Sequence, residues 1–311
     1  MIGRTQIYLK NLLAAPLEIS PDIARKVIVV FTHSRASLLA DCLSSLKSAY
    51  GFEAWHLVVV HQKGVAEVEL VIQKNKEFID TLIEFKANYK EIRANIDYSR
   101  LIGTKFAFEN LSADYVLGVE EDTIISKGAL NFIDFVSERY QSNRAFRGVN
   151  LGSVEPKNEH QIGGYSLLRF GLHGQAGVLN KRSWSYIAKK QLFEVKEPFG
   201  WDSKIEFYLK SGFMVTPNIS RDLDFGWGGT HAPSSPTHPY YLAMQKSFAS
   251  LDDEGIKTYT NIEITHTWRK DAVNYKKAAS LFYFVRRSGW LYLLVRRGKL
   301  IFLKETFNPN S

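Results

Sequence analysis

The amino-terminal third of the chain alternates short apolar runs with stretches whose apolar residues recur every three or four positions. The runs Lys26–Thr32 (KVIVVFT) and 55–61 (WHLVVVH) are rich in β-branched residues and predict buried strands. Helices are expected after Ser34, which suits a helix cap, and over 95–110, with a third strand at Thr81–Phe85. This order predicts an α/β fold in which a mostly parallel sheet carries helices on both faces.

The apolar run 116–119 ends abruptly in three carboxylates, Glu120, Glu121 and Asp122. Adjacent acids at the end of a buried strand repel one another and lose hydration unless a cation neutralises them. Mg²⁺ or Mn²⁺ prefers oxygen ligands and keeps positions for substrate phosphates. The segment therefore predicts a metal–diphosphate site at the end of a parallel strand. The alternative is a solvated turn after a core strand.

Ligands of open α/β sheets bind at the carboxyl ends of the strands. Thr32 and Arg35 follow the first predicted strand, and Gln62 follows the second. We therefore expect these three residues to converge with the acids on one ligand site, where Arg35 pairs with an anionic group. The alternative for Arg35 is an ordinary surface arginine.

The second half of the chain is less regular. A helix is expected at Ala129–Tyr140 and strands at 146–151 and 215–219. Asp202 follows Trp201 just before a predicted helix, which suits either a general base with a raised pKa or a helix N-cap. His231 lies in 225–240, a Gly- and Pro-rich stretch typical of a lid, and would contact phosphate, hold a metal or be solvated.

Composition limits the possible classes of protein. The 311 residues are 45% hydrophobic, enough for one extended core. Cys42 is the single cysteine, so no intrachain disulfide forms and a zinc site built on two cysteines is excluded. The sequence contains no uncharged apolar run long enough to predict a membrane-spanning helix or a signal peptide. Residues 1–25 predict a helical or irregular lead-in. A cytoplasmic protein is therefore expected.

The net charge of +8 belongs to the last part of the chain. Residues 266–311 carry ten basic and two acidic side chains, so residues 1–265 are neutral overall. Within this tail, 281–303 alternates aromatic and aliphatic clusters with Arg-Arg pairs, which predicts an amphipathic segment on the anionic inner face of a membrane. One alternative is a packed helix pair with solvated arginines. A nucleic-acid patch ranks lower, because the remaining chain is neutral.

Several motifs in order resemble the GT-A-fold glycosyltransferases, and among them the N-acetylglucosaminyltransferase I family of inverting enzymes. The motifs are Thr32-His33-Ser34-Arg35, Glu120-Glu121-Asp122, Phe199-Gly200-Trp201-Asp202, Pro217-Asn218-Ile219-Ser220-Arg221, Phe225-Gly226 and Gly229-Thr230-His231. The resemblance covers roughly residues 26–235. We expect residues 1–265 to form one glycosyltransferase-like domain, with a nucleotide-sugar-binding half at 26–122 and an acceptor and catalytic half at 123–265, followed by the basic tail 266–311. The family has Asp where this chain has Glu121.

The resemblance implies a role for each matching residue. Asp122 would hold Mn²⁺ or Mg²⁺ beside the diphosphate of the donor. Asp202 would take the proton from the acceptor hydroxyl as that oxygen attacks the sugar from the opposite face. The residues expected to contact the donor are Thr32, Arg35, Gln62, Glu120, Glu121, Trp201 and His231.

Two classes of function follow. The first is a metal-dependent inverting glycosyltransferase that moves a sugar, such as N-acetylglucosamine, from a UDP-sugar to a glycan or a lipid-linked acceptor. The second is a non-catalytic protein of the same fold that binds glycan, lipid or nucleic acid. The presence of both the acid triplet and Asp202 favours the enzyme, because a pure binding protein needs only one of them.

Overall fold

A computed structural model describes residues 5–8, 25–87, 92–152, 164–168, 176–189, 209, 212–226, 237, 242, 245 and 260–261. The chain divides into two compact units, Met1–Glu263 and Ile264–Ser311. All described residues belong to the first unit. The basic tail 266–311 lies outside the described residues, so its membrane role stays a prediction.

Ten of the described strands form one sheet in the order β1-β4-β3-β2-β5-β9-β7-β10-β8-β12. Strands β1 to β5 are parallel to one another, and β9 runs antiparallel to both of its neighbours, β5 and β7. The strand bounds are β1 Thr5–Tyr8, β2 Lys26–Thr32, β3 His56–Gln62, β4 Thr81–Phe85, β5 Tyr115–Glu120, β7 Phe146–Asn150, β8 Gly164–Leu168, β9 Ala176–Asn180, β10 Phe213–Pro217 and β12 Thr260–Asn261.

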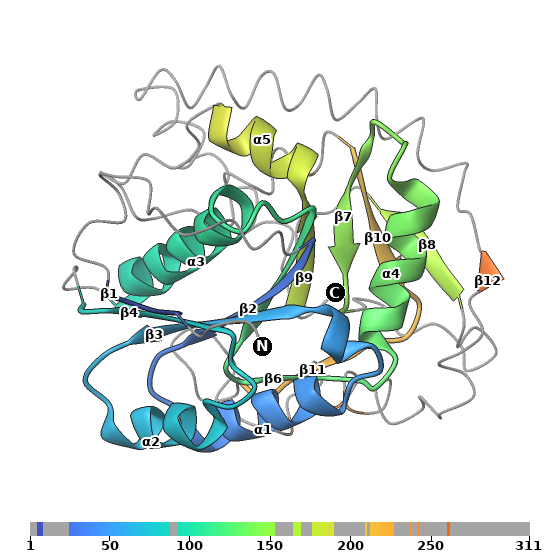
Figure 1. Cartoon of the computed structure of the whole chain (residues 1–311). Helices are drawn as coiled ribbons and strands as arrows, with labels where there is room; N and C mark the ends of the chain where they lie inside the picture. The colour runs from blue at the N-terminus through green and yellow to red at the C-terminus, as the bar shows by residue number, and fades with distance from the viewer. Residues whose placement is uncertain are drawn as a thin grey trace, which may run out of the picture. The chain divides into compact units, whose positions relative to one another are not determined.

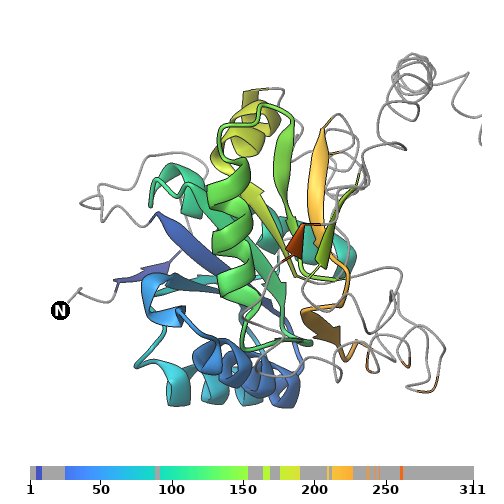
Figure 2. The same cartoon turned by 90° about the vertical axis from the view of Figure 1, so that its right-hand side faces the viewer.

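Five α-helices accompany the sheet in the described part of the chain. They are α1 Ala36–Ser48, α2 Ala66–Asn75, α3 Ile92–Glu109, α4 Ala129–Tyr140 and α5 Lys181–Lys189, with a short 3-10 helix at Phe52–Ala54. Figure 1 shows α1 and α2 on one side of the sheet and α3 on the other. In Figure 2 α1 and α2 again lie together on one side, and α4 runs along β7. The predicted α/β architecture, a mostly parallel sheet with helices on both faces, is confirmed.

The sequence pattern explains why these strands lie between two helical layers. Val27 and Val29 of β2 belong to the hydrophobic cluster beneath α3. Ile28 and Val30 are also fully buried, and successive side chains of a strand point to opposite faces, so both faces of β2 are covered. A continuous apolar run such as KVIVVFT is what a strand buried on both faces requires.

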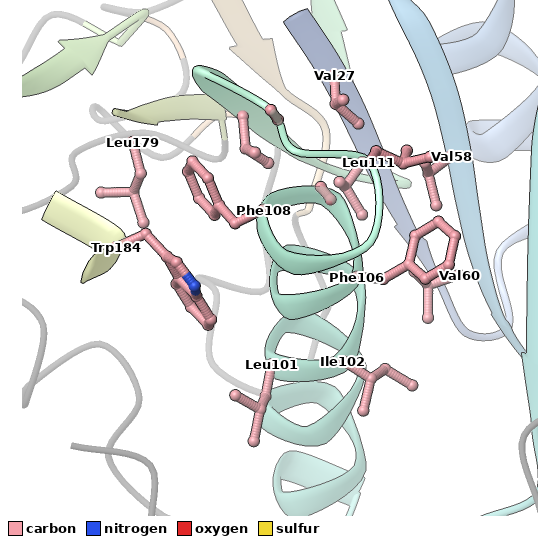
Figure 3. Packing of buried hydrophobic residues seen from close by; sticks show 14 of the residues in the cluster. Val27, Val58, Val60, Leu101, Ile102, Phe106, Phe108, Leu111, Leu179 and Trp184 are labelled. Atoms are coloured by element: carbon pink, nitrogen blue, oxygen red, sulfur yellow. The ribbon is translucent and has the colours of Figure 1, made fainter. Parts of the chain in front are cut away.

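Helix α3 sits very close to the sheet. Figure 3 shows Phe106 directed toward Val60, while Phe108 is directed toward Trp184 of α5. The rings of Phe108 and Trp184 stack with their centroids 5.3 Å apart. Gly103 allows this approach, because a Cβ at that position would lie only 2.6 Å from the Val29 side chain. This close packing holds α3, the helix before β5, against the sheet.

Two short strands form a separate ribbon. β6 (Thr123–Ile125) pairs antiparallel with β11 (Asp222–Asp224), and β6 lies against α1 (Figure 1). Neither strand was expected from the sequence. The helical or irregular structure expected for residues 1–25 is wrong at Thr5–Tyr8, which forms strand β1 and pairs parallel with β4. The strand expected at 215–219 begins and ends two residues earlier, at Phe213–Pro217.

Candidate functional site

The predicted donor residues of the first half meet at the carboxyl ends of three adjacent strands. Thr32 is paired with His61 across β2 and β3, and Phe31 is paired with Glu120 across β2 and β5. Gln62 is the last residue of β3. The segments at the ends of β2, β3 and β5 therefore lie side by side, as the sequence predicts.

Glu121 organises the loop between β2 and α1. Its carboxylate accepts hydrogen bonds from the backbone N–H groups of His33, Ser34 and Arg35 at 2.7, 3.1 and 3.2 Å. The expectation that Ser34 caps α1 is wrong, since Arg35 is the N-cap residue and no side chain of its own helix forms the cap. Glu121 supplies this interaction from the turn after β5, because a carboxylate at a helix N-terminus satisfies free N–H groups and the helix dipole. Contact between Glu121 and a nucleoside stays a prediction.

Asp122 lies in the turn after β5, with its side chain only 14% exposed. Oδ2 accepts a hydrogen bond from the Arg35 guanidinium at 2.7 Å. Oδ1 is buried and has no hydrogen-bond partner among the described residues. Burial, reinforced by the charges of Glu120 and Asp224, raises the pKa of Asp122 to about 7, and Arg35 opposes the rise. The alternative of a solvated turn is therefore wrong.

A second carboxylate, Asp224, reaches the same place from β11. Asp224 is paired with Thr123 across the ribbon, and the Phe225 N–H donates to the carbonyl oxygen of Asp122 at 2.8 Å. Gly226 shows how close the two acids lie, because a Cβ there would stand 2.7 Å from Asp224 Oδ1 and 2.9 Å from Asp122 Oδ2. The buried Asp224 accepts the Gly226 N–H at 2.5 Å.

Glu120, the first acid of the triplet, pairs with Arg100 of α3. Arg100 also lies 4.0 Å from Asp97, one turn earlier on the same helix. The side chain of Glu120 is 25% exposed, more than that of Asp122. α3 thus supplies a guanidinium to the first acid, while the β2–α1 loop supplies one to the third.

Thr32 and Gln62 remain candidates for contact with a ligand. Thr32 is buried, and its hydroxyl has no partner within the described ranges. The same holds for the side-chain oxygen of Gln62. His61, which is paired with Thr32, is fully buried, and burial lowers its pKa. Buried polar atoms of this kind find partners in native structures, often on a ligand or water.

The remaining predicted site residues lie outside the described residues. These are Trp201, Asp202 and His231. Their roles stay predictions. Among the residues that are described, no cluster of three or more His, Cys, Asp or Glu side chains is arranged to hold a metal ion. No helix in that same part of the chain has the length and apolar character needed to cross a membrane.

Sequence reasoning missed Asp224 and Arg100. The only signal for Asp224 is the acidic, strand-like tripeptide Asp222–Asp224 ahead of Phe225-Gly226. Its place opposite Asp122 depends on the pairing of β6 with β11, which three-residue strands do not reveal. Arg100 carries no signal beyond its place on a helix before the acid-tipped strand.

No protein-family model matches the chain, and no curated protein matches it. Among solved structures, the chain is similar to S. aureus TarS, with a TM-score of 0.49, 12% identity, and coverage of 75% of this chain and 41% of that chain. TarS residues 1–349 give a TM-score of 0.45 with 10% identity, covering 75% of this chain and 68% of that one. The same fragment in complex with UDP gives 0.45 and 11%, covering 62% and 58%. The chain thus spans about two fifths of the first TarS chain and less than two thirds of the UDP-bound fragment.

Proposed function

We propose that the chain is a metal-dependent inverting glycosyltransferase that uses a UDP-sugar donor. One observation carries the proposal: Asp122 is a largely buried carboxylate at the carboxyl end of a parallel strand, with Oδ1 lacking any partner in the described part of the chain. Burying a carboxylate is costly unless a positive group compensates it. A largely buried carboxylate at the carboxyl end of a parallel strand is suited to bind a cation together with an anionic ligand.

The residues around Asp122 fit a hard divalent ion. Asp122 offers a carboxylate oxygen, and Asp224 places a second negative charge beside it. Mg²⁺ and Mn²⁺ are typically held in proteins by one or two carboxylates and substrate phosphates. When bound, the ion would neutralise the negative charge that develops on the leaving diphosphate. Asp122 is the residue proposed to hold it.

The donor would lie along the carboxyl ends of β2, β3 and β5. Arg35 can form charge-assisted hydrogen bonds with phosphate oxygens. Thr32 and Gln62 offer polar atoms that are buried and unpartnered within the described residues, which supports contact with the donor. Glu120 is proposed for the nucleoside side, since it is the more exposed of the paired acids.

The chemical step rests on Asp202, by resemblance to the inverting family. Asp202 removes the proton of the acceptor hydroxyl while its oxygen bonds to the anomeric carbon. The bond from that carbon to the diphosphate oxygen breaks, and UDP leaves with the electron pair. We propose a glycan or a lipid-linked acceptor at the inner face of a membrane, with the tail 266–311 as the membrane contact.

Donor binding tests the proposal directly. Calorimetry would measure UDP and UDP-sugar affinity at several Mn²⁺ concentrations for the wild type and for Asp122→Asn. We expect Mn²⁺ to strengthen UDP binding to the wild type. Asp122→Asn should lose at least about 100-fold of that affinity, since losing even a hydrogen-bond partner of a metal ligand typically costs about 10–100-fold. Asp134→Asn is the matched control, because Asp134 forms an ion pair with Lys26 at the opposite end of β2.

The outcomes distinguish a metal-binding role of Asp122 from a purely structural one. An unchanged Mn²⁺ dependence in Asp122→Asn would contradict the proposal. Equal losses in Asp122→Asn and Asp134→Asn would point to a general effect on the fold and would also contradict it. Product analysis with the bound sugar donor then identifies the anomeric configuration of the transferred sugar.

A further inference from the structure

The carboxylate proposed to hold the metal already has a cationic partner within the protein, on the oxygen opposite the unpartnered Oδ1. Arg35 donates to Asp122 Oδ2 at 2.7 Å, with the side chains 28% and 14% exposed. A charge-assisted bond of this length in a partly dry environment is strong. A divalent ion that uses this carboxylate must therefore compete with the guanidinium.

Arg35 is held in this position by the backbone and not by its side chain alone. Its N–H group, with those of His33 and Ser34, is bound to the carboxylate of Glu121. Glu121 and Asp122 are consecutive, so the same turn fixes the loop and receives its arginine. The Arg35–Asp122 ion pair is therefore fixed by the β2–α1 loop. Glu121 holds the backbone of the loop, and the next residue, Asp122, binds the side chain of Arg35.

We propose that Arg35 exchanges partners: it neutralises Asp122 before the ion binds, and it turns to the diphosphate when the ion takes Asp122. This inference rests on the proposed function. Two positive groups repel each other on one carboxylate, and the guanidinium has a better anionic partner in a nearby diphosphate, which accepts paired N–H bonds. Asp224 beside Asp122 keeps negative charge at the site after Arg35 has left.

The exchange makes the ion and the nucleotide bind interdependently. The ion alone must displace Arg35 and leave it without its carboxylate partner. With UDP present, the displaced guanidinium gains a phosphate. UDP therefore strengthens ion binding, and by linkage the ion strengthens UDP binding by the same factor.

The test measures Mn²⁺ binding without turnover. Mn²⁺ would be titrated into the full chain, and electron paramagnetic resonance would measure the free ion. The titration is done with and without saturating UDP, for the wild type and for Arg35→Gln. We expect Arg35→Gln to bind Mn²⁺ alone about tenfold more tightly, because a hydrogen-bonded charge pair no longer has to be broken. The factor by which UDP strengthens Mn²⁺ binding should fall by about tenfold in the same variant.

Lys63→Gln is the matched control. Lys63 is a cation at the same sheet edge, but it pairs with Glu84 at 3.2 Å and not with Asp122. Removing its charge should leave the Mn²⁺ affinity within about twofold, since a screened charge outside the site contributes little. An equal gain in Lys63→Gln would mean that net charge alone sets the affinity and would overturn the exchange.

Other results also decide the matter. If Arg35→Gln binds Mn²⁺ alone no more tightly than the wild type, Arg35 does not compete with the ion, and the inference is wrong. If it binds more tightly but UDP keeps its full effect, Arg35 does not turn to the diphosphate, and the inference is wrong. If the wild type binds neither Mn²⁺ nor UDP under any condition, the proposed function fails as well, which is distinct from a failure of Arg35 alone.

Discussion

Asp222 should make the protein less stable as the pH rises. It is fully buried at the start of β11, and its carboxylate accepts hydrogen bonds from the Ser220 hydroxyl at 3.0 Å and the Ala176 N–H at 3.2 Å. Burial raises its pKa from 3.8 to about 7, although both hydrogen bonds oppose the rise. Asp222→Asn keeps the shape, because the amide oxygen can accept from Ala176 and the amide nitrogen can donate to Ser220.

The sign and size of the effect follow from proton linkage. Between pH 4 and 7 the folded protein holds a proton on Asp222 that the unfolded chain releases, so the free energy of unfolding falls as the pH rises through this window. The two pH units between pH 5 and a pKa of about 7, at about 1.4 kcal/mol each, give about 3 kcal/mol. Relative to Asp222→Asn, the wild type should therefore lose about 3 kcal/mol of stability between pH 5 and pH 8.

Urea unfolding followed by circular dichroism at several pH values measures this difference. Asp122 titrates in the same range, since burial also raises its pKa to about 7. It is present in both proteins, so the comparison between wild type and variant isolates Asp222. Parallel curves of unfolding free energy against pH would refute the reasoning, as would a variant that is less stable than the wild type at pH 8.

Further predictions concern packing, chemistry and the tail. A methyl group at Gly103 would stand 2.6 Å from Val29 and 2.7 Å from Val60, so Gly103→Ala should lower the free energy of unfolding by about 1–3 kcal/mol in urea titrations. Asp202→Asn should lower kcat about 10²–10⁴-fold with donor affinity unchanged; a loss of stability without a loss of turnover per folded molecule would favour the helix-cap alternative. Truncation after Lys277 should release the protein from anionic liposomes in sedimentation assays, and equal binding of full-length chain to neutral vesicles would contradict the membrane role.

The elements predicted correctly are those whose local pattern is sufficient. β2 and β4 have the expected bounds, and so has α4. Each carries either a run dominated by apolar residues or a helical apolar stripe. Thr5–Tyr8 could not be found in this way, because its residues become a strand only through pairing with β4. The same is true of β6 and β11, whose pairing joins distant parts of the chain.

The candidate site shows the same division. A triplet of acids at the end of an apolar run predicts a strand end with uncompensated negative charge, and Asp122 lies there largely buried, with Arg35 beside it. The sequence could not assign different environments to consecutive acids. Glu121 points to the backbone of the β2–α1 loop, whereas Glu120 pairs with Arg100 of α3. Those differences arise from tertiary packing, which brings a different segment against each acid.

The β6–β11 ribbon has a consequence for synthesis of the chain on the ribosome. The backbone of Asp122 is tied to Phe225, and Asp224 completes the acidic pair. Roughly 100 residues separate the two halves, which at about 5–20 residues per second takes on the order of 5–20 s to translate. Nascent chains arrested before Asp224 should therefore fail to bind immobilised UDP with Mn²⁺, although β2 to β5 are already complete. During this interval the growing polypeptide already contains the acid-tipped strand β5 but lacks the segment that places Asp224 beside Asp122.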